Sequence, residues 1–505
     1  MDFLSSHLLS LILFVPAASA VVMLFLPKDE VKLLRWFAFA ASLIPFALAV
    51  YVWIQFKPDA AGFQFSEQYT WYAAIGSSLH LGVDGLSLTM VLLTTLLTPL
   101  ALLASFSVSD RVKPYMMLFL FLETGMLGVF LAMDLLIFFV FWEIGLVPMY
   151  FLINQWGSAN RNYASLKFMI YTMGGSLGLL LGIQLLGALF GTFDLATIMT
   201  KWTSAQGTLL GFPMATVKDV IFWAFVIAFA IKVPIWPFHT WLPDAHTEAP
   251  TAGSMILAGV LLKLGAYGFL RLVLPLYPEQ AKSFAWALAL LATAAIVFGA
   301  FASYAQTDFK RLVAYSSVNH MGFVMLGIAA AALASGTADA RIALNGAILQ
   351  MFNHGLSAAG MFFLVGVIYE RTHTRNLDEF GGLFPLVPVY GGILIFTSMA
   401  SLGLPGLNGF VSEFLVVRGS YPLLTPYTAI SMLGLLFTGA YILKGIMKVL
   451  HGPLNEHWAQ GEHKLTEIST REVIVMAPLM ALILVIGVWP AWILDVINKA
   501  VMHLF

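Results

Sequence analysis

The sequence predicts an all-α, polytopic membrane protein with about fourteen transmembrane helices, and two observations lead to this prediction. Of the 505 residues, 60% are hydrophobic and only 10% are charged, whereas about 25% of the residues of a soluble domain are charged. Apolar stretches of about 20 residues, the length that crosses a bilayer, recur along the whole chain. The net charge of −1 supplies no basic surface for nucleic acid.

The candidate spans are joined by linkers that are too short to form a second domain. The longest linkers are 56–85, 191–218 and 452–471, and the middle one has the Gly/Thr/Asp-rich composition of a surface loop. The candidate spans, in chain order, are 8–26, 36–55, 86–106, 114–131, 135–154, 165–190, 218–238, 253–274, 282–303, 310–334, 342–369, 387–417, 429–450 and 472–495.

The first of these helices is expected to be retained in the mature protein. Ala18-Ser19-Ala20 is similar to a cleavage site, but no Lys or Arg precedes it to form the basic region of a signal peptide. The apolar run also continues through Val21–Leu26, beyond the point of cleavage.

The seventh span, 218–238, runs into the segment Ile227–Pro250, where it carries a charge and is interrupted. An apolar run from Val220 is followed by Lys232 and then by two prolines. Proline removes a backbone hydrogen bond from a helix, and in a bilayer such a break persists only beside protein or water. A lysine beside a broken helix at membrane depth is therefore a candidate functional residue.

A second interrupted helix occurs five spans later, at Leu402–Glu413, which contains a proline, three glycines and an acid. Spans four to eight and nine to thirteen therefore predict two five-helix repeats, each with a broken fourth helix. An odd number of helices per repeat makes the two copies inverted. We divide the single membrane domain (1–505) into N-terminal helices (1–110), a first repeat (111–275), a second, inverted repeat (276–452), and a C-terminal loop with the last helix (453–505).

Basic residues predict the orientation of the chain in the membrane. Fourteen of the 25 Lys and Arg residues lie on odd-numbered loops or on the span ends beside them, and eight lie on the other side. Because basic residues concentrate on the cytoplasmic side, the odd-numbered loops are predicted to be cytoplasmic and both termini periplasmic. The remaining three, Lys232, Lys263 and Lys444, lie inside spans.

Ionisable side chains inside the spans indicate a polar path through the protein, because one lysine at a helix centre costs about 2.5–3.5 kcal/mol. For Lys232 and Glu143 two interpretations stand. A carboxylate that moves towards or away from a buried lysine would load or unload its proton, or the two residues form a static ion pair. The spans and the segments next to them also hold Glu123, His239, His320, His354, Lys263 and Glu413.

Lys263 lies near the middle of its span, where its side chain reaches the membrane surface only with difficulty. His320 and His354 are flanked by hydroxyl groups and small residues that admit water, so each is either a proton relay or a hydrogen-bonded packing residue. No metal site is predicted, because His239 and His246 lack HExxH spacing. The chain also has no Cys for an iron–sulfur cluster.

Three aspartates at predicted span ends, Asp84, Asp134 and Asp244, are expected to act as helix caps and loop contacts.

Several motifs closely resemble the antiporter-like membrane subunits of respiratory complex I, the NADH:quinone oxidoreductase. The motifs are AIKVPIWPFHTWLPDAHTEAP with AGVLLKLGAYGFLR, FKRLVAYSSVNHMGF, QMFNHGLSAAGMFFLVG and ERTHTRNLDEFGG, and the resemblance extends from about Gly82 to Gly452. In this family the L and N types carry Lys in the second broken helix, whereas the M type carries Glu. Glu413, and the absence of a long lateral helix before the chain stops at Phe505, match the M type.

The resemblance implies fourteen helices with two inverted five-helix repeats and a central hydrophilic axis. In that axis Glu143 would pair with and modulate Lys232, and Lys263 would connect the two half-channels. The family pattern also implies roles for three further residues. His320 and His354 would bridge Lys263 to Glu413, and Glu413 would lead towards the periplasm.

The resemblance also implies that the chain translocates protons while partner subunits oxidise NADH and reduce quinone. FMN, iron–sulfur clusters and quinone would be held by those partners, with L-type and N-type neighbours and lipid around the chain in the cell inner (plasma) membrane. The alternatives are a subunit of a multisubunit cation/proton antiporter or of a membrane-bound hydrogenase, and a structural spacer that conducts nothing. Na⁺ prefers several oxygen ligands, so Lys and His at the centre favour H⁺.

Overall fold

Bundled membrane-spanning helices make up the fold, which we describe from a computed structural model of residues 6–209, 211–460 and 464–504. Within these residues, 12 helical segments are long and apolar enough to cross a membrane. Helix α2 (Leu8–Met23) and the interrupted pair α18 (Pro388–Leu402) and α19 (Asn408–Ser420) complete the fourteen predicted spans. The predicted all-α membrane fold is therefore confirmed.

The first half of the chain contains the N-terminal helices and the first group of five spans. After α2 come α3 (Val31–Gln55), β1 (Gln64–Tyr72), η1 (Ala73–Ile75), β2 (Ser77–Val83), α4 (Gly85–Ala104), η2 (Ser105–Ser107), α5 (Val112–Leu131), α6 (Leu135–Ile144), α7 (Leu146–Trp156), α8 (Arg161–Phe190), α9 (Leu195–Thr203), β3 (Thr208–Leu209), β4 (Phe212–Pro213), α10 (Met214–Lys232), α11 (Trp241–Glu248), α12 (Thr251–Ile256), η3 (Leu257–Leu261), α13 (Leu262–Gly268), η4 (Phe269–Val273) and α14 (Leu274–Leu276).

The second group of five spans and the C-terminal helices follow. They are α15 (Pro278–Ala305), α16 (Phe309–Leu333), α17 (Ala338–Thr372), η5 (Leu377–Glu379), α18, α19, α20 (Thr425–Leu450), η6 (Glu456–Trp458), α21 (Thr470–Val488) and α22 (Ala491–Leu504). The fourth span is interrupted in both groups, between α10 and α11 and between α18 and α19. Each group is therefore interrupted where the repeat prediction expects a break, and the inverted arrangement of the two groups stays a prediction.

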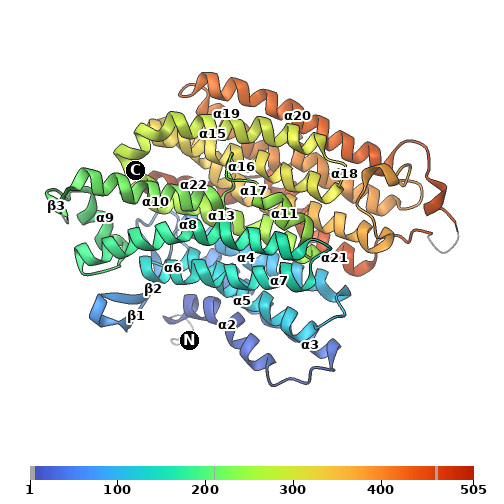
Figure 1. Cartoon of the computed structure of the whole chain (residues 1–505), viewed down its shortest axis with the longest axis horizontal. Helices are drawn as coiled ribbons and strands as arrows, with labels where there is room; N and C mark the ends of the chain where they lie inside the picture. The colour runs from blue at the N-terminus through green and yellow to red at the C-terminus, as the bar shows by residue number, and fades with distance from the viewer. Residues whose placement is uncertain (1–5, 210, 461–463, 505) are drawn as a thin grey trace.

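The helices lie broadly along one direction, and the loops gather at the two ends of the bundle (Figure 1). The strands β1, β2 and β3 and helix α22 lie at the left end in this view, whereas the loop after α20 lies at the right end. The right end therefore carries odd-numbered loops, which the basic residues predict to be cytoplasmic.

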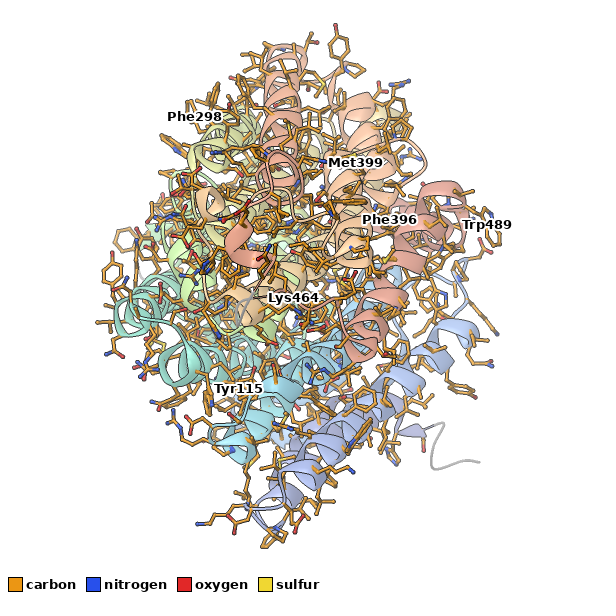
Figure 2. All side chains as sticks on the ribbon, turned by 90° about the vertical axis from the view of Figure 1, so that its right-hand side faces the viewer. Tyr115, Phe298, Phe396, Met399, Lys464 and Trp489 are labelled. Carbon is orange, nitrogen blue, oxygen red and sulfur yellow. The ribbon has the colours of Figure 1, made fainter. Side chains whose placement is uncertain are left out.

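Four spans form the buried centre of the bundle. These are α4, the composite span α12–α14, α16 and α17. Almost every residue in the apolar part of each of these spans is buried by the other helices. The outer helices instead present apolar side chains to the surroundings. Phe298 on α15 and Trp489 after α21, which are 52% and 65% exposed, extend from different sides of the bundle (Figure 2). The four central spans, which carry Lys263, His320 and His354, are therefore shielded from lipid by the outer helices.

Four features of the chain differ from the sequence prediction. The linker 56–85 contains an antiparallel hairpin of β1 and β2, and the loop 191–218 contains α9 and a small pairing of β3 with β4. The predicted span 135–154 is two helices, because Pro148 has no N–H to bond the carbonyl of Ile144. The predicted span 472–495 ends at Val488, because a residue that precedes a proline is disfavoured in helical geometry.

Two of the three predicted helix caps are confirmed. Asp84 accepts a hydrogen bond from the Ser87 amide at the start of α4, and Asp134 accepts two amides at the start of α6. Asp244 is not a cap. It lies inside α11, where its carboxylate is 2.7 Å from the Lys167 ammonium.

The β1–β2 hairpin is tied to the loop before α9 by a histidine–aspartate pair. His80 Nδ1 lies 3.0 Å from Asp194 Oδ2, and this hydrogen bond is the largest cause that lowers the pKa of the Asp194 carboxyl to about 2. An unfolded aspartate has a pKa of about 3.9. The stabilising contribution of Asp194 is therefore present above a pH of about 4 and is lost as the pH falls towards 2.

Replacing Asp194 with asparagine is expected to loosen the hairpin at neutral pH. Loss of a charge-assisted hydrogen bond of this kind costs roughly 1–2 kcal/mol, so amide hydrogen exchange of residues 77–83 should rise about fivefold or more. The matched control is Asp59→Asn, because Asp59 pairs with Lys499 at the surface. Unchanged exchange in the Asp194 variant would show that the pair does not hold the hairpin.

Candidate functional site

Lys263 lies at the centre of the bundle and is completely buried. It is on α13, between two wider π-helical turns, η3 and η4, and such turns are frequent at functional sites. Its ammonium donates to the backbone carbonyl of Ala258 and lies 2.7 Å from Nδ1 of His354. The predicted meeting of Lys263 with His354 is thus a direct hydrogen bond.

Close helix packing makes this hydrogen bond possible. Beside His354, a Cβ at Gly355 would lie only 3.0 Å from the carbonyl oxygen of Gly259, so glycine lets α17 approach the span of Lys263. In the same span, a Cβ at Gly265 would lie 2.7 Å from the carbonyl oxygen of Phe229 on α10. The two glycines hold the central span close to both of its functional neighbours.

A second buried pair lies further along the same row. His320 Nδ1 on α16 is 2.8 Å from Oε1 of Glu413 on α19, and both side chains are almost fully buried. Gln350 donates to the same carboxylate oxygen at 3.0 Å, and the Tyr441 hydroxyl lies 3.2 Å from the other ring nitrogen of His320. The acid of the second broken helix is therefore held by a histidine, an amide and, through that histidine, a phenol.

The two pairs are neighbours. The rings of His320 and His354 lie 5.7 Å apart between centroids, a separation that one water molecule can bridge. Lys263, His354, His320 and Glu413 consequently form one row, which runs from the last span of the first helix group into the second group.

Neutral polar side chains surround this row, and sequence reasoning missed them. Ser412 donates to Gln350 at 2.5 Å, and Asn353 donates to Ser412 and to the backbone of Asn408. Each is buried among apolar residues. The sequence does contain a signal for these residues, because polar residues recur at helical spacing on two helices. They are Gln350, Asn353 and His354 on α17, and Asn408, Ser412 and Glu413 on α19.

Lys232 occupies the end of α10, where the first broken helix stops, and is 2% exposed. Its ammonium lies 5.1 Å from the centre of the Trp142 ring, and the Glu143 carboxylate acts on it electrostatically. No ion pair within 4.0 Å joins Lys232 to Glu143 in the described chain. Oε1 of Glu143 is buried and has no hydrogen-bond partner. The tightly bonded static pair is thus not formed.

Two further buried ionisable groups have no hydrogen-bond partners on their side chains. Glu123 on α5 is completely buried with both carboxyl oxygens unbonded. His246 on α11 is also completely buried, with both ring nitrogens unbonded, and its ring stacks on Phe362 at 4.4 Å between centroids. The charges of Lys263 and of Lys310 both act on His246, so this histidine lies beside the row.

A cavity lies at the end of the bundle that carries the odd-numbered loops. It measures about 250 Å³ and is lined by Lys310, Glu248, Arg375 and Ser107, among others. Ser107 lies at the surface, whereas Lys310 is buried and donates to the backbone carbonyl of Ala249. The sequence analysis counted Lys310 only among the cations of the loops and span ends, because its candidate span, 310–334, begins at this residue.

Metal binding finds no support in the described residues. None of them forms a group of three or more His, Cys, Asp or Glu side chains that could hold a metal ion. His239, on the segment between α10 and α11, packs its ring near Tyr315 at 6.2 Å and belongs to no ligand set.

Comparisons with known proteins show the family to which the chain belongs. Residues 132–447 match the family described as NADH:quinone oxidoreductase/Mrp antiporter, TM. The NADH-quinone oxidoreductase subunit M of Rhodobacter capsulatus is 40% identical over 505 residues, which cover 99% of this chain and 96% of the relative. The family match confirms the predicted resemblance, and the subunit M relative confirms its M type.

Solved structures share the fold. A chain of respiratory complex I from Thermus thermophilus with bound NADH superposes with a TM-score of 0.84 at 27% identity, covering 98% of this chain and 99% of that chain. A chain of the Mrp complex from a Dietzia species has a TM-score of 0.82 at 23% identity and shares the fold, with coverage of 98% and 52%. The chain therefore belongs to the NADH:quinone oxidoreductase/Mrp antiporter transmembrane family and, within it, to the subunit M group.

Proposed function

We propose that this chain is a proton-translocating membrane subunit of an NADH:quinone oxidoreductase. The observation that carries the proposal is the buried row Lys263–His354–His320–Glu413, in which each neighbouring pair is hydrogen-bonded or one water apart. Ionisable groups are costly in a membrane and mark ion or proton pathways. The chain would be multi-pass in the cell inner (plasma) membrane, with both termini on the periplasmic side.

The oxidoreductase chemistry would take place in partner subunits. The chain has no Cys to bind an iron–sulfur cluster, and the family resemblance assigns FMN, iron–sulfur centres and quinone to those partners. Its neighbours in the membrane would be the L-type and N-type antiporter-like subunits. Subunit M relatives are named as parts of NADH-quinone oxidoreductase, which supports this assembly.

The row suggests how a proton would move. The Lys263 ammonium would donate to Nδ1 of His354 along the 2.7 Å bond. His354 would pass a proton across the gap between the rings to His320, and His320 would pass it to Glu413 along a 2.8 Å bond. Gln350 would stabilise the Glu413 carboxylate until the proton arrives, and the Tyr441 hydroxyl would remain hydrogen-bonded to the His320 ring. Glu413 would then release the proton towards the periplasm.

The first broken helix would control this transfer. A buried lysine holds its proton more tightly when a carboxylate approaches it. Because the Glu143 carboxylate is near Lys232 but not bonded to it, a small movement of α6 or α10 would change their interaction strongly. Glu143 and Lys232 would act in this way as a switch that sets when Lys263 is loaded.

Protons would reach Lys263 from the cavity at Lys310. The cavity opens at the predicted cytoplasmic end, and the charges of Lys310, which lines it, and of Lys263 both act on the unbonded His246. A histidine with two free ring nitrogens can accept a proton from one side and donate it on the other.

Replacing Lys310 with methionine is therefore expected to slow proton pumping by roughly fivefold, less than a full proton-transfer group contributes, because water in the cavity substitutes in part. The measurement is the initial rate of NADH-driven acidification in proteoliposomes, normalised to NADH oxidation by an artificial electron acceptor. Lys201→Met, at an exposed position on α9, is the control. An unaltered rate in the Lys310 variant would remove the cavity from the pathway.

The proposed function is tested by purifying the assembly through a tag on this chain. We expect flavin and iron–sulfur subunits to co-purify, and the reconstituted complex to acidify vesicles with NADH and quinone at a rate that does not depend on Na⁺. A preparation with only membrane partners, which exchanges cations for protons without NADH, would instead identify a cation/proton antiporter. Pumping that persists when the buried ionisable residues are all apolar would identify a structural spacer.

A further inference from the structure

A second cavity lies away from the proton-transfer row, on the outer face of α20. It measures about 660 Å³ and is lined by Lys444, Lys448 and His451 of α20 and its C-terminal end, by Tyr304 of α15 and by Asp378 of η5. All these residues lie at the end of the bundle that carries the odd-numbered loops. The cavity therefore combines three basic groups with a position at one membrane surface.

Lys444 presents a fixed positive charge in this cavity. Its ammonium donates to the backbone carbonyls of Tyr304 and Gln306 at 2.6 and 2.8 Å, and it lies 5.2 Å from the centre of the Tyr304 ring. A lysine has three N–H donors, so one donor remains for an anion. In the described part of the chain, no carboxylate oxygen lies within 4.0 Å of this ammonium.

Lys448 is paired only weakly. Its ammonium is 2.7 Å from Asp378, and the two side chains are 48% and 57% exposed. An ion pair that is exposed to this extent contributes little stability. The Lys448 side chain is thus free to exchange Asp378 for another anion at small cost.

The surface beside these basic groups is apolar and faces outwards. Leu436, Leu443 and Met447 of α20 are 68%, 50% and 62% exposed and run along the helix towards the middle of the membrane. Basic residues at the end of a transmembrane helix, with an apolar stripe next to them, match a phosphate headgroup with its acyl chains. Tyr304 adds an aromatic ring at the level of the headgroups.

We propose that this cavity binds one anionic phospholipid of the leaflet on the side of the odd-numbered loops. Its phosphate lies between Lys444 and Lys448, near His451, and its acyl chains run along Leu443 and Met447. Charge complementarity selects the anionic lipid, since two lysines face a single carboxylate in the cavity. The site is separate from the proton-transfer row, and its assignment does not depend on which ion the chain transports.

The test compares variants with opposite expected effects in the intact complex. The complex is reconstituted in nanodiscs of phosphatidylcholine with phosphatidylglycerol, and the phosphatidylglycerol that remains bound after delipidation is counted by native mass spectrometry. Lys448→Gln should weaken retention about fivefold, the contribution of one lysine near an anionic headgroup. Asp378→Asn should strengthen retention, because it removes the carboxylate that competes for Lys448.

Each remaining outcome is decisive. If the two variants change retention in the same direction, or not at all, the Lys448–Asp378 pair is structural and the proposal fails. Lys201→Gln, at the opposite end of the bundle, should change nothing. Addition of inorganic phosphate should not displace the lipid; displacement would show a phosphate site without a lipid. A map of the intact complex with a neighbouring subunit seated on Leu443 and Met447 would also overturn the proposal.

Discussion

Replacing Lys232 with alanine is expected to abolish NADH-driven proton pumping while the complex still assembles. Lys232 is 2% exposed and ends the helix that is interrupted in the first group of five spans. Removal of a positioned proton-transfer group lowers a rate by about a hundredfold or more. The measurement is the number of protons moved per NADH oxidised in proteoliposomes, together with subunit content as a check of assembly.

The geometry gives a reason to expect loss of pumping instead of loss of folding. The Lys232 ammonium has no hydrogen-bonded carboxylate, and its nearest described aromatic contact is the face of Trp142 at 5.1 Å. Because no described carboxylate is bonded to the Lys232 ammonium, removing this lysine leaves no buried charge without its bonded partner. A large loss of folding stability is therefore not expected. A static ion pair would behave in the opposite way, because breaking it strands a charge.

Two further variants separate a switch from a packing role. Glu143→Ala should also abolish pumping, and the double variant should be no worse than either single one, because residues that act as a unit are not additive. Lys201→Ala, which replaces an exposed lysine of α9, is the control. A normal proton-to-electron ratio in both the Lys232 and Glu143 variants would exclude the proposed relay.

The large-scale fold was predictable because each span satisfies a simple physical requirement. A bilayer demands about 20 apolar residues per crossing, and proline marks where a helix must stop, as at Pro234 and Pro405. Membrane cost also identified Lys263, His320 and Glu413, since nothing in packing explains ionisable groups there. The structure brings these three residues and His354 into one row.

Other parts of the structure depend on contacts that no local pattern encodes. The β1–β2 hairpin pairs with segments that follow α5 and α8, as in the contact of Leu81 with Ala132, and its strands carry polar residues on both faces. Gln350 and Ser412 are ordinary polar residues until the two helices meet and bond each other. For the same reason the sequence suggested that Glu143 pairs with Lys232, but could not distinguish a bonded pair from neighbours held apart.

Replacing Glu413 with lysine is the second variant with a large expected effect. L-type and N-type subunits carry lysine at the corresponding position, so the change tests whether the acid of this chain matters. We expect pumping to fall by about tenfold or more, since about 1.4 kcal/mol of added barrier suffices for a tenfold loss. Acidification rate and proton-to-electron ratio in proteoliposomes are the measurements.

The surroundings of Glu413 explain the expected loss. Its carboxylate accepts hydrogen bonds from Gln350 and lies 2.8 Å from His320, so the site is built for a negative charge. A lysine there would face a protonated His320, and two like charges at 4 Å repel by roughly 4 kcal/mol at the effective dielectric constant of such sites. Proton arrival at His320 would therefore be opposed at the step that the row must perform.

Glu413→Gln separates charge from shape in this prediction. Glutamine preserves the size of the side chain and can still accept from Gln350, but it cannot bind a proton, so pumping should fall while assembly remains normal. The lysine variant should be worse than the glutamine variant, because it adds repulsion to the loss of the acid. If both variants pump at the normal ratio, Glu413 is not on the route, and the row must end at His320.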